Sequence, residues 1–144
     1  GRWLGDGWLR TGQRTHRPFG QKWGQVLICD SLSKEEELRL AIEAVTDKYS
    51  VERSKGIVKF KLCGQVFCNW LKENFGQYSY GKELPSWVYG MNCDWRAALL
   101  KGICDSDGHK QGENMWKIST VSQKLAEGIR ILGEIAGYST TIHL

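Results

Sequence analysis

Two segments of the chain end in an Asp-Gly pair, and their aspartates are the residues best suited to bind a metal. The segments are Gly1–Gly7 and Leu100–Gly108. Aligned on their Asp-Gly pairs, they match Asp6 with Asp107. Two carboxylates brought close together repel each other unless a divalent cation lies between them, and hard cations such as Mg²⁺ prefer oxygen ligands. The repeat therefore predicts one metal site to which Asp6 and Asp107 both contribute.

Two helices that pack side by side would deliver these aspartates to one place, because each Asp-Gly follows an apolar segment. The alignment also matches Gly1 with Gly102, and glycines allow two helix backbones to approach closely. Asp105 aligns with Leu4 and has no acidic counterpart, so we expect it to end its helix or to form hydrogen bonds. Asp-Gly after a helix is also an ordinary turn, but two matched copies favour metal binding.

The same order of elements is predicted after each Asp-Gly: a hairpin, a helix that begins at a serine, and a strand. The first half is expected to contain strands at 8–16 and 23–30, a helix after Ser33 with Glu36 completing a capping box, and a strand at 57–62 with Val58, Phe60 and Leu62 on one face. The second half is expected to contain a helix from 94 to its Asp-Gly, a hairpin whose second strand is 115–121, a helix after Ser122 that stops at Gly137, and a strand from 140. Such a repeat predicts pseudo-two-fold symmetry.

Apolar spacing predicts the extent of the remaining elements. The helix after Ser33 is expected to reach Tyr49, because apolar residues recur at near-helical spacing: Leu38, Ile42, Val45 and Tyr49. A short helix is expected at 67–75, stopped by Gly76. A polar linker at 77–82 and a turn or short helix after Pro85 are expected to follow.

The composition is that of one ordinary globular domain. The chain has 144 residues and a net charge of +4 at pH 7, which is compatible with a polyanionic partner but does not require one. Its five cysteines lack zinc-site spacing and are expected to be reduced core thiols of an intracellular protein, in the cytoplasm or nucleoid. No apolar run is long enough to span a bilayer and no signal-peptide pattern is present, so no membrane partner is expected.

Several segments resemble one family, the LAGLIDADG homing endonucleases. Leu100–Gly108 resembles the signature of that family, and Gly1–Gly7 resembles a shortened first copy. Gly81–Val88 resembles the Lys-x-Leu-Pro segment that precedes the second signature in the endonuclease domains of inteins, the DOD type. Residues 118–126 resemble the segment downstream of the second signature. The resemblance extends over nearly the whole chain.

The resemblance implies an α+β fold of two pseudo-symmetric αββαββα repeats that form a saddle. Residues 1–144 would be one endonuclease domain and a pseudo-symmetric monomer, with repeat 1 at about 1–84 and an incomplete repeat 2 at about 85–144. The first helix would lack its N-terminal turns, and the second repeat would stop after its third strand. We therefore expect the fold to be truncated at both ends, as in a fragment of a longer protein.

The resemblance also implies Mg²⁺-dependent hydrolysis of both strands of a long, specific DNA site. Asp6 and Asp107 would be catalytic residues and metal ligands, with Mg²⁺ activating water and stabilising the leaving 3′ oxygen. Lys82 matches the lysine of Lys-x-Leu-Pro and would polarise a water molecule or stabilise charge on the phosphoryl group. Without the resemblance, Lys82 would be interpreted as a solvated lysine in a linker.

Basic and amide side chains on the predicted hairpins and on the polar strand face are candidates for contacts with double-stranded DNA. Two-stranded ribbons fit the major groove, and phosphate contacts supply most of the affinity. The candidates are Arg10, Gln13, Arg14, Arg17, Lys22, Gln25, Lys59, Lys61, Lys110 and Lys117.

Two other functions are compatible with the same fold. One is a catalytically inactive DNA-binding or structural insert, and the other is an RNA maturase. In each case the partner in cis would be a host protein or an intein splicing domain. Gly1 and Leu144 provide neither the nucleophile nor the terminal Asn that splicing needs, so the chain is not expected to splice by itself.

Overall fold

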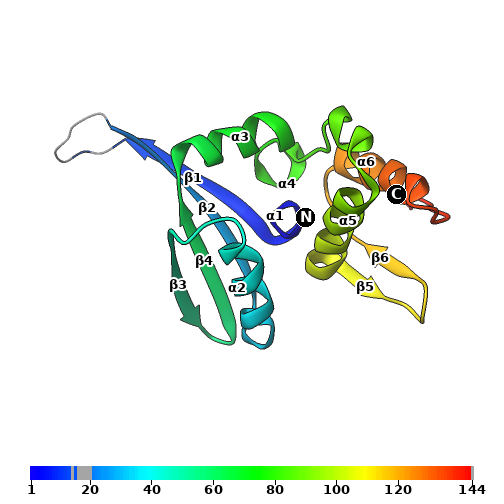
Figure 1. The fold of residues 1–144 in the computed structure, drawn as a ribbon, viewed down its shortest axis with the longest axis horizontal. Helices are drawn as coiled ribbons and strands as arrows, with labels where there is room; N and C mark the ends of the chain where they lie inside the picture. The colour runs from blue at the N-terminus through cyan, green and yellow to red at the C-terminus, as the bar shows by residue number, and fades with distance from the viewer. Residues whose placement is uncertain (14, 16–20, 144) are drawn as a thin grey trace. The chain divides into compact units, whose positions relative to one another are not determined.

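The computed structural model describes residues 1–13, 15 and 21–143 (Figure 1). These residues form two compact units, one made of Gly1–Gly5 with Glu73–Leu144 and the other of Asp6–Lys72. Helices are combined with antiparallel strand pairs in these units, which confirms the predicted α+β class. The division into two repeats near residue 84 stays a prediction.

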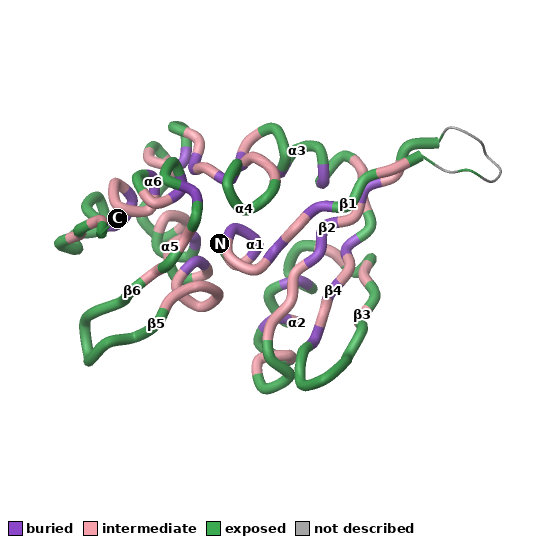
Figure 2. The backbone as a smooth tube through the Cα atoms, turned by 180° about the vertical axis from the view of Figure 1, so that it is seen from behind, coloured by how far each residue is buried: buried purple, intermediate pink, exposed green. Residues whose placement is uncertain are grey.

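An antiparallel sheet of four strands organises the unit Asp6–Lys72. Its order is β1-β2-β4-β3, and its strands are β1 at Gly7–Gln13, β2 at Lys22–Ser31, β3 at Tyr49–Ser54 and β4 at Ile57–Cys63. Along β4, Val58, Phe60 and Leu62 are buried whereas the two lysines between them are half-exposed, as the alternation predicts (Figure 2). We call the face that carries Lys59 and Lys61 the outer face of the sheet.

Helix α2 (Glu35–Glu43) follows β2 through a 3₁₀ turn at Leu32–Lys34. The predicted capping box is wrong, because Ser33 lies inside the 3₁₀ turn and no side chain caps α2. The predicted extension of the helix to Tyr49 is also wrong. Tyr49 begins β3, and its ring packs 5.5 Å from that of Phe60. Pairing of β3 with β4 therefore overrides the helical spacing of the sequence, a tertiary effect that local patterns do not carry.

Helix α3 (Gln65–Phe75) confirms the helix expected at 67–75 and ends, as predicted, at Gly76. Gly76 has a positive φ of 80°, and a Cβ there would lie 1.7 Å from the carbonyl oxygen of Gly81. Glycine is required on both counts. The polar linker predicted at 77–82 is wrong in part, because Tyr78–Gly81 form the short helix α4.

The other unit is largely helical. Helix α1 spans Arg2–Asp6, and all of it except Asp6 belongs to this unit. The other elements are a 3₁₀ turn at Ser86–Gly90 after Pro85, α5 (Cys93–Asp107), β5 (Gly108–Lys110), β6 (Trp116–Ile118) and α6 (Gln123–Ile135). The hydroxyl of Ser122 accepts a hydrogen bond from the Leu125 N–H at 3.2 Å, which confirms the predicted start of α6. Gly137 has a positive φ of 90° and ends the helix as predicted.

Two predicted strands in this unit are wrong in extent. The strand expected at 115–121 is only Trp116–Ile118. The strand expected from 140 is absent from residues 140–143, which the structure describes. The Thr140 hydroxyl turns back toward α6, 3.4 Å from the Arg130 carbonyl and 3.1 Å from the Glu134 carboxylate. These contacts hold the segment after residue 140 against α6, so it does not continue as an extended strand.

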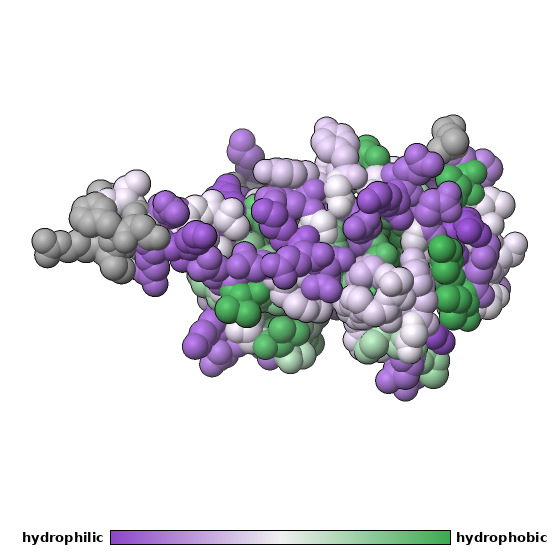
Figure 3. All heavy atoms as spheres, turned by 90° about the horizontal axis from the view of Figure 1, so that it is seen from above, coloured by the Kyte–Doolittle hydropathy of each residue, from purple (hydrophilic) through white to green (hydrophobic). Residues whose placement is uncertain are grey.

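Among the residues that the structure describes, no helix is both long enough and apolar enough to span a bilayer. Hydrophobic side chains on the face seen from above form small patches separated by hydrophilic ones (Figure 3).

All five cysteines are free thiols. Cys63 and Cys93 are exposed, which corrects the expectation that each cysteine is a core residue.

Candidate active site

Helices α1 and α5 cross with their backbones in contact, and glycines make this possible. A Cβ added to Gly102 would lie 2.9 Å from the Cα of Gly1 and 3.0 Å from the amide nitrogen of Arg2. A Cβ added to Gly1 would lie 2.4 Å from the carbonyl oxygen of Leu99. Any larger residue would have to push the two backbones apart. The close approach predicted for Gly1 and Gly102 is confirmed.

A second small-residue contact lies one helical turn further along the crossing. A Cβ added to Gly5 would lie 2.2 Å from the Ser106 hydroxyl and 2.8 Å from the Cγ of Asp107. The Ser106 hydroxyl donates to carbonyls of its own helix, 3.1 Å from Gly102 and 3.0 Å from Ile103, so its polar group is satisfied there. Sequence reasoning missed this pair, although small residues spaced i, i+4 on both segments could have indicated it.

The contacts across the crossing join positions that the sequence alignment had matched. Gly1 contacts Gly102, and Gly5 contacts Ser106, which are equivalent positions of the two Asp-Gly segments. A two-fold axis brings each residue against its own equivalent. The crossing of α1 and α5 is therefore locally pseudo-symmetric.

Lys82 is buried, not solvated. Only 5% of the residue is exposed, and its ammonium donates to the carbonyls of Trp3, Leu4 and Gly5 at 3.0, 2.9 and 2.9 Å. These are the last carbonyls of α1, where a cation is favoured by the helix dipole. The ammonium also lies 4.9 Å from the centre of the Trp3 ring. Lys82 thus caps α1, and its catalytic role stays a prediction.

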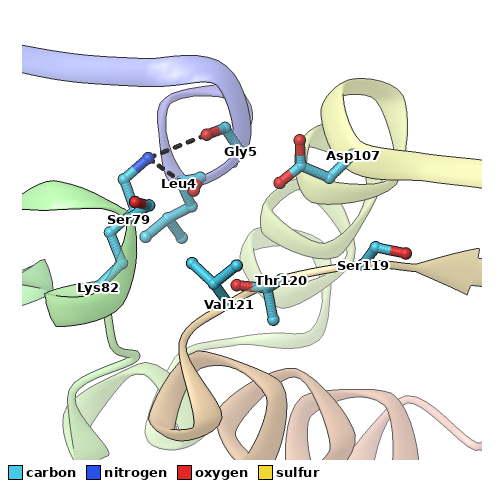
Figure 4. Close-up of a pocket in the computed structure, with 8 residues that line it drawn as sticks. All are labelled: Leu4, Gly5, Ser79, Lys82, Asp107, Ser119, Thr120 and Val121. Atoms are coloured by element: carbon cyan, nitrogen blue, oxygen red, sulfur yellow. Dashed lines mark hydrogen bonds between the residues drawn. The ribbon is translucent and has the colours of Figure 1, made fainter. Parts of the chain in front are cut away.

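A pocket of about 320 Å³ lies beside the crossing of α1 and α5. It is lined by Leu4, Gly5, Ser79, Lys82, Asp107, Ser119, Thr120 and Val121. Figure 4 shows Asp107 at the end of α5 and Lys82 across the pocket from it, with hydrogen bonds from the lysine to Leu4 and Gly5. The three hydroxyl residues of this lining were not predicted, because they come from segments far apart in the sequence.

Burial raises the pKa of the Asp107 carboxyl above its usual range, and the nearby charge of Lys82 opposes that rise. The ionised carboxylate is therefore only partly compensated, and a cation in the pocket would favour it. The described residues contain no cluster of three or more His, Cys, Asp or Glu side chains that could hold a metal ion. The donors present fit a hard cation that keeps waters or takes phosphate oxygens as further ligands.

The other two aspartates of the Asp-Gly segments, Asp6 and Asp105, have different surroundings from each other. Asp6 is the last residue of α1, and its carbonyl accepts a hydrogen bond from the Cys29 thiol at 3.6 Å. The convergence of its carboxylate with that of Asp107 stays a prediction. Asp105 pairs with Arg2 at 3.6 Å and with Lys101 at 2.5 Å, which confirms the hydrogen-bonding role expected for it.

Strand register separates the candidate DNA-binding residues of the four-stranded sheet. Arg10 pairs with Gln25, which pairs with Cys63, so Arg10 and Gln25 share the outer face with Lys59 and Lys61. Gln13 pairs with Lys22, and both belong to the opposite face by the same alternation. Arg14 and Arg17 lie outside the described residues. Four of the eight candidates in this region therefore form one surface.

The second hairpin also separates its two candidates. Lys110 pairs with Trp116, whereas Lys117 pairs with His109. Adjacent residues of a strand point to opposite faces. Lys110 and Lys117 consequently lie on opposite faces of this two-stranded ribbon, and a single flat contact with DNA would use one of them.

Comparison with known proteins agrees with this geometry at the level of the fold. No protein-family model matches the sequence. Crystal structures of the homing endonuclease I-DmoI in complex with DNA and Mn, and with DNA and Ca, are similar to the chain, with TM-scores of 0.69 and 0.67 and 14% identity. The similarity covers 99% of this chain and 77% and 72% of those chains. The chain therefore has the homing-endonuclease fold that I-DmoI represents.

Curated proteins of quite different description are similar in sequence. The ATP-dependent DNA helicase Hel308 of Thermococcus kodakarensis is 32% identical over 133 residues, which cover 82% of this chain. An iron-sulfur cluster assembly SufBD family protein of Mycobacterium leprae is 28% identical over 135 residues, which cover 92% of this chain. The chain spans 12% and 14% of the lengths of these relatives.

Proposed function

We propose that the chain is the DNA-cleaving domain of a LAGLIDADG homing endonuclease of the intein type, acting as a pseudo-symmetric monomer inside the cell. The crossing of α1 and α5 carries this proposal, because equivalent positions of two signature-like segments contact each other in pairs beside a pocket. The proposed reaction is Mg²⁺-dependent hydrolysis of both strands of a specific DNA site. The fold shared with I-DmoI, crystallised in complex with DNA, supports DNA as the substrate.

The two aspartates are the proposed metal ligands. The pairing that joins Gly1 with Gly102 and Gly5 with Ser106 would next join Asp6 with Asp107. Carboxylates, waters and phosphate oxygens form a ligand set that Mg²⁺ prefers. When bound, Mg²⁺ would supply a water of lowered pKa and neutralise charge on the scissile phosphate.

Other residues of the pocket position the reacting groups in this proposal. Lys82 holds the last carbonyls of α1, so it fixes the end of the helix that carries Asp6. Its proposed catalytic role, stabilising charge on the phosphoryl group, adds to this positioning. The hydroxyls of Ser79, Ser119 and Thr120 line the pocket, where they are placed to orient water or phosphate oxygens by hydrogen bonds.

The two curated relatives support an insertion into unrelated host proteins. A DNA helicase and an iron-sulfur cluster assembly protein differ in described activity, yet each matches most of this chain over a small share of its own length. A segment common to both proteins does not account for the helicase activity of one or the cluster-assembly role of the other. We infer that the segment is a mobile insert, as the endonuclease domain of an intein would be, with a splicing domain and host protein in cis.

The contacts of Lys82 also favour a second candidate, a catalytically inactive insert that binds DNA or is purely structural. Backbone carbonyls accept from its ammonium in three hydrogen bonds, and an ammonium has three N–H donors, so this arrangement serves the structure of α1 rather than a bound phosphate. Cleavage separates the two candidates. The full-length protein is incubated with a library of random duplex sites, with Mg²⁺ or with EDTA, and the new ends are sequenced. An endonuclease gives double-strand breaks at one sequence in the sample with Mg²⁺ and none in the sample with EDTA, whereas an inactive insert gives no breaks in either sample.

A further inference from the structure

An acidic side chain lies among the basic residues of the outer face. Glu52 of β3 is the register partner of Lys59 of β4. Its carboxylate is 2.6 Å from the ammonium of Lys61 and 4.0 Å from that of Lys59. About half of the Glu52 side chain, 48%, is exposed. The hydrogen bond from Lys61 and the charge of Lys59 hold the pKa of Glu52 below its usual range, so the carboxylate is ionised at neutral pH.

Lys59 has a second partner on the same face. Its ammonium lies 5.7 Å from the centre of the Trp8 ring, and Trp8 is paired with Leu27 in β1 and β2. Both lysines of the outer face of β4 are therefore held by neighbours in the same sheet, Lys59 by Trp8 and Glu52 and Lys61 by Glu52. A phosphate would have to compete with Glu52 for both of them.

A carboxylate on a surface that binds a polyanion opposes binding. It repels phosphates and neutralises part of the lysine charge that releases counterions from DNA. An ionised carboxylate can only accept hydrogen bonds. In the major groove, the base groups that donate are the amino groups of cytosine and adenine. In a complex with DNA, a base amino group would compensate the Glu52 carboxylate on some base sequences and not on others.

Resting on the proposed DNA-binding function, we propose that Glu52 is a specificity residue of the outer face. Its carboxylate accepts a hydrogen bond from a base amino group at one position of the target site. On every other duplex it lowers affinity by holding Lys59 and Lys61 in ion pairs. The residue was not a sequence candidate, because an acidic residue on a polar strand face carries no signal until the register places it between lysines.

The test compares Glu52→Gln with a charge-matched control. Glu36→Gln removes the same charge from helix α2, where Glu36 pairs with Arg39. The Arg39 guanidinium lies 5.6 Å from the centre of the Phe60 ring, so this part of α2 is on the face of the sheet opposite the outer face. Affinity of the full-length protein for a random-sequence duplex is measured against salt concentration, without metal. One additional effective lysine contact should steepen the plot of log affinity against log salt by about 1 in Glu52→Gln. Glu36→Gln should follow the wild-type line.

Selection from a random duplex library then reads the base preference. Sites selected by the wild type should require C or A at one position that sites selected by Glu52→Ala do not. Alanine is used for this step because the amide oxygen of a glutamine would still accept from a base amino group. Thermal unfolding verifies that all three variants are folded. A wild-type salt slope in Glu52→Gln together with a wild-type base profile in Glu52→Ala would overturn this inference alone. A wild type without salt-dependent binding to duplex DNA would overturn the proposed function itself.

Discussion

Gly1 and Gly102 lie backbone against backbone where α1 crosses α5. In Gly102→Ala, the new methyl group would lie 2.9 Å from the Cα of Gly1, so the helices must separate. Overpacking of about 1–3 kcal/mol should outweigh the gain in helix propensity of about 1 kcal/mol. We expect a fall in Tm of a few degrees in thermal unfolding followed by circular dichroism.

Gly81 provides a matched control for that substitution. It also lies in a helix, α4, but a Cβ there meets no atom within 4 Å. Gly81→Ala should leave Tm unchanged or raise it slightly. A Gly102→Ala variant as stable as Gly81→Ala would contradict the tight crossing.

Asp6 and Asp107 are predicted to share bound metal. In a crystal structure of the protein soaked with Mn²⁺, anomalous scattering should locate metal against both carboxylates. The physical reason is that each carboxylate supplies only part of the oxygen ligand set. Carboxylates separated by more than about 10 Å, too far to coordinate neighbouring metals, would rule out the shared site.

Lys82→Met should destabilise the protein even without metal or DNA. The substitution keeps the size of the side chain but removes three charge-assisted hydrogen bonds to the end of α1. Loss of hydrogen bonds to a charged group suggests about 2–4 kcal/mol, measured by urea unfolding. Lys82→Arg should recover part of it. If Lys82→Met lost cleavage without losing stability, the residue would be catalytic and its capping role minor.

Glu35 should make stability depend on pH in the acid range. Hydrogen bonds from Arg53 and Arg39 lower the Glu35 pKa from 4.5 to about 2, and the Arg53 contact is 2.8 Å long. Because the folded pKa is depressed, this stabilisation is complete above pH 4.5 and is lost as pH falls toward 2. Urea unfolding should show wild type and Glu35→Gln converging over that range. Parallel curves would mean that solvent screens the network completely.

The sequence predicts the parts of this site that depend on local pattern. The matched Asp-Gly segments indicate the contact of Gly1 with Gly102, and Ser122 before an amphipathic run indicates the start of α6. Long-range contacts determine the rest. Tyr49 fits a helical stripe but joins a strand because β4 is available to pair with it. Lys82 looks like a solvated residue until the end of α1 surrounds its ammonium, and Glu52 acquires a role only from strand register.

Asp107→Asn tests the central claim most directly. Asn has nearly the same shape, so the crossing should survive, but it lacks the charge that holds Mg²⁺ against its hydration shell. Cleavage by the intact protein is measured on the duplex library, and binding by gel shift without metal. We expect no cleavage and equal or tighter binding, because a repulsive charge beside phosphate is gone. Asp105→Asn, whose partners are Arg2 and Lys101, should still cleave. An active Asp107→Asn, or an inactive Asp105→Asn with a native fold, would contradict the site.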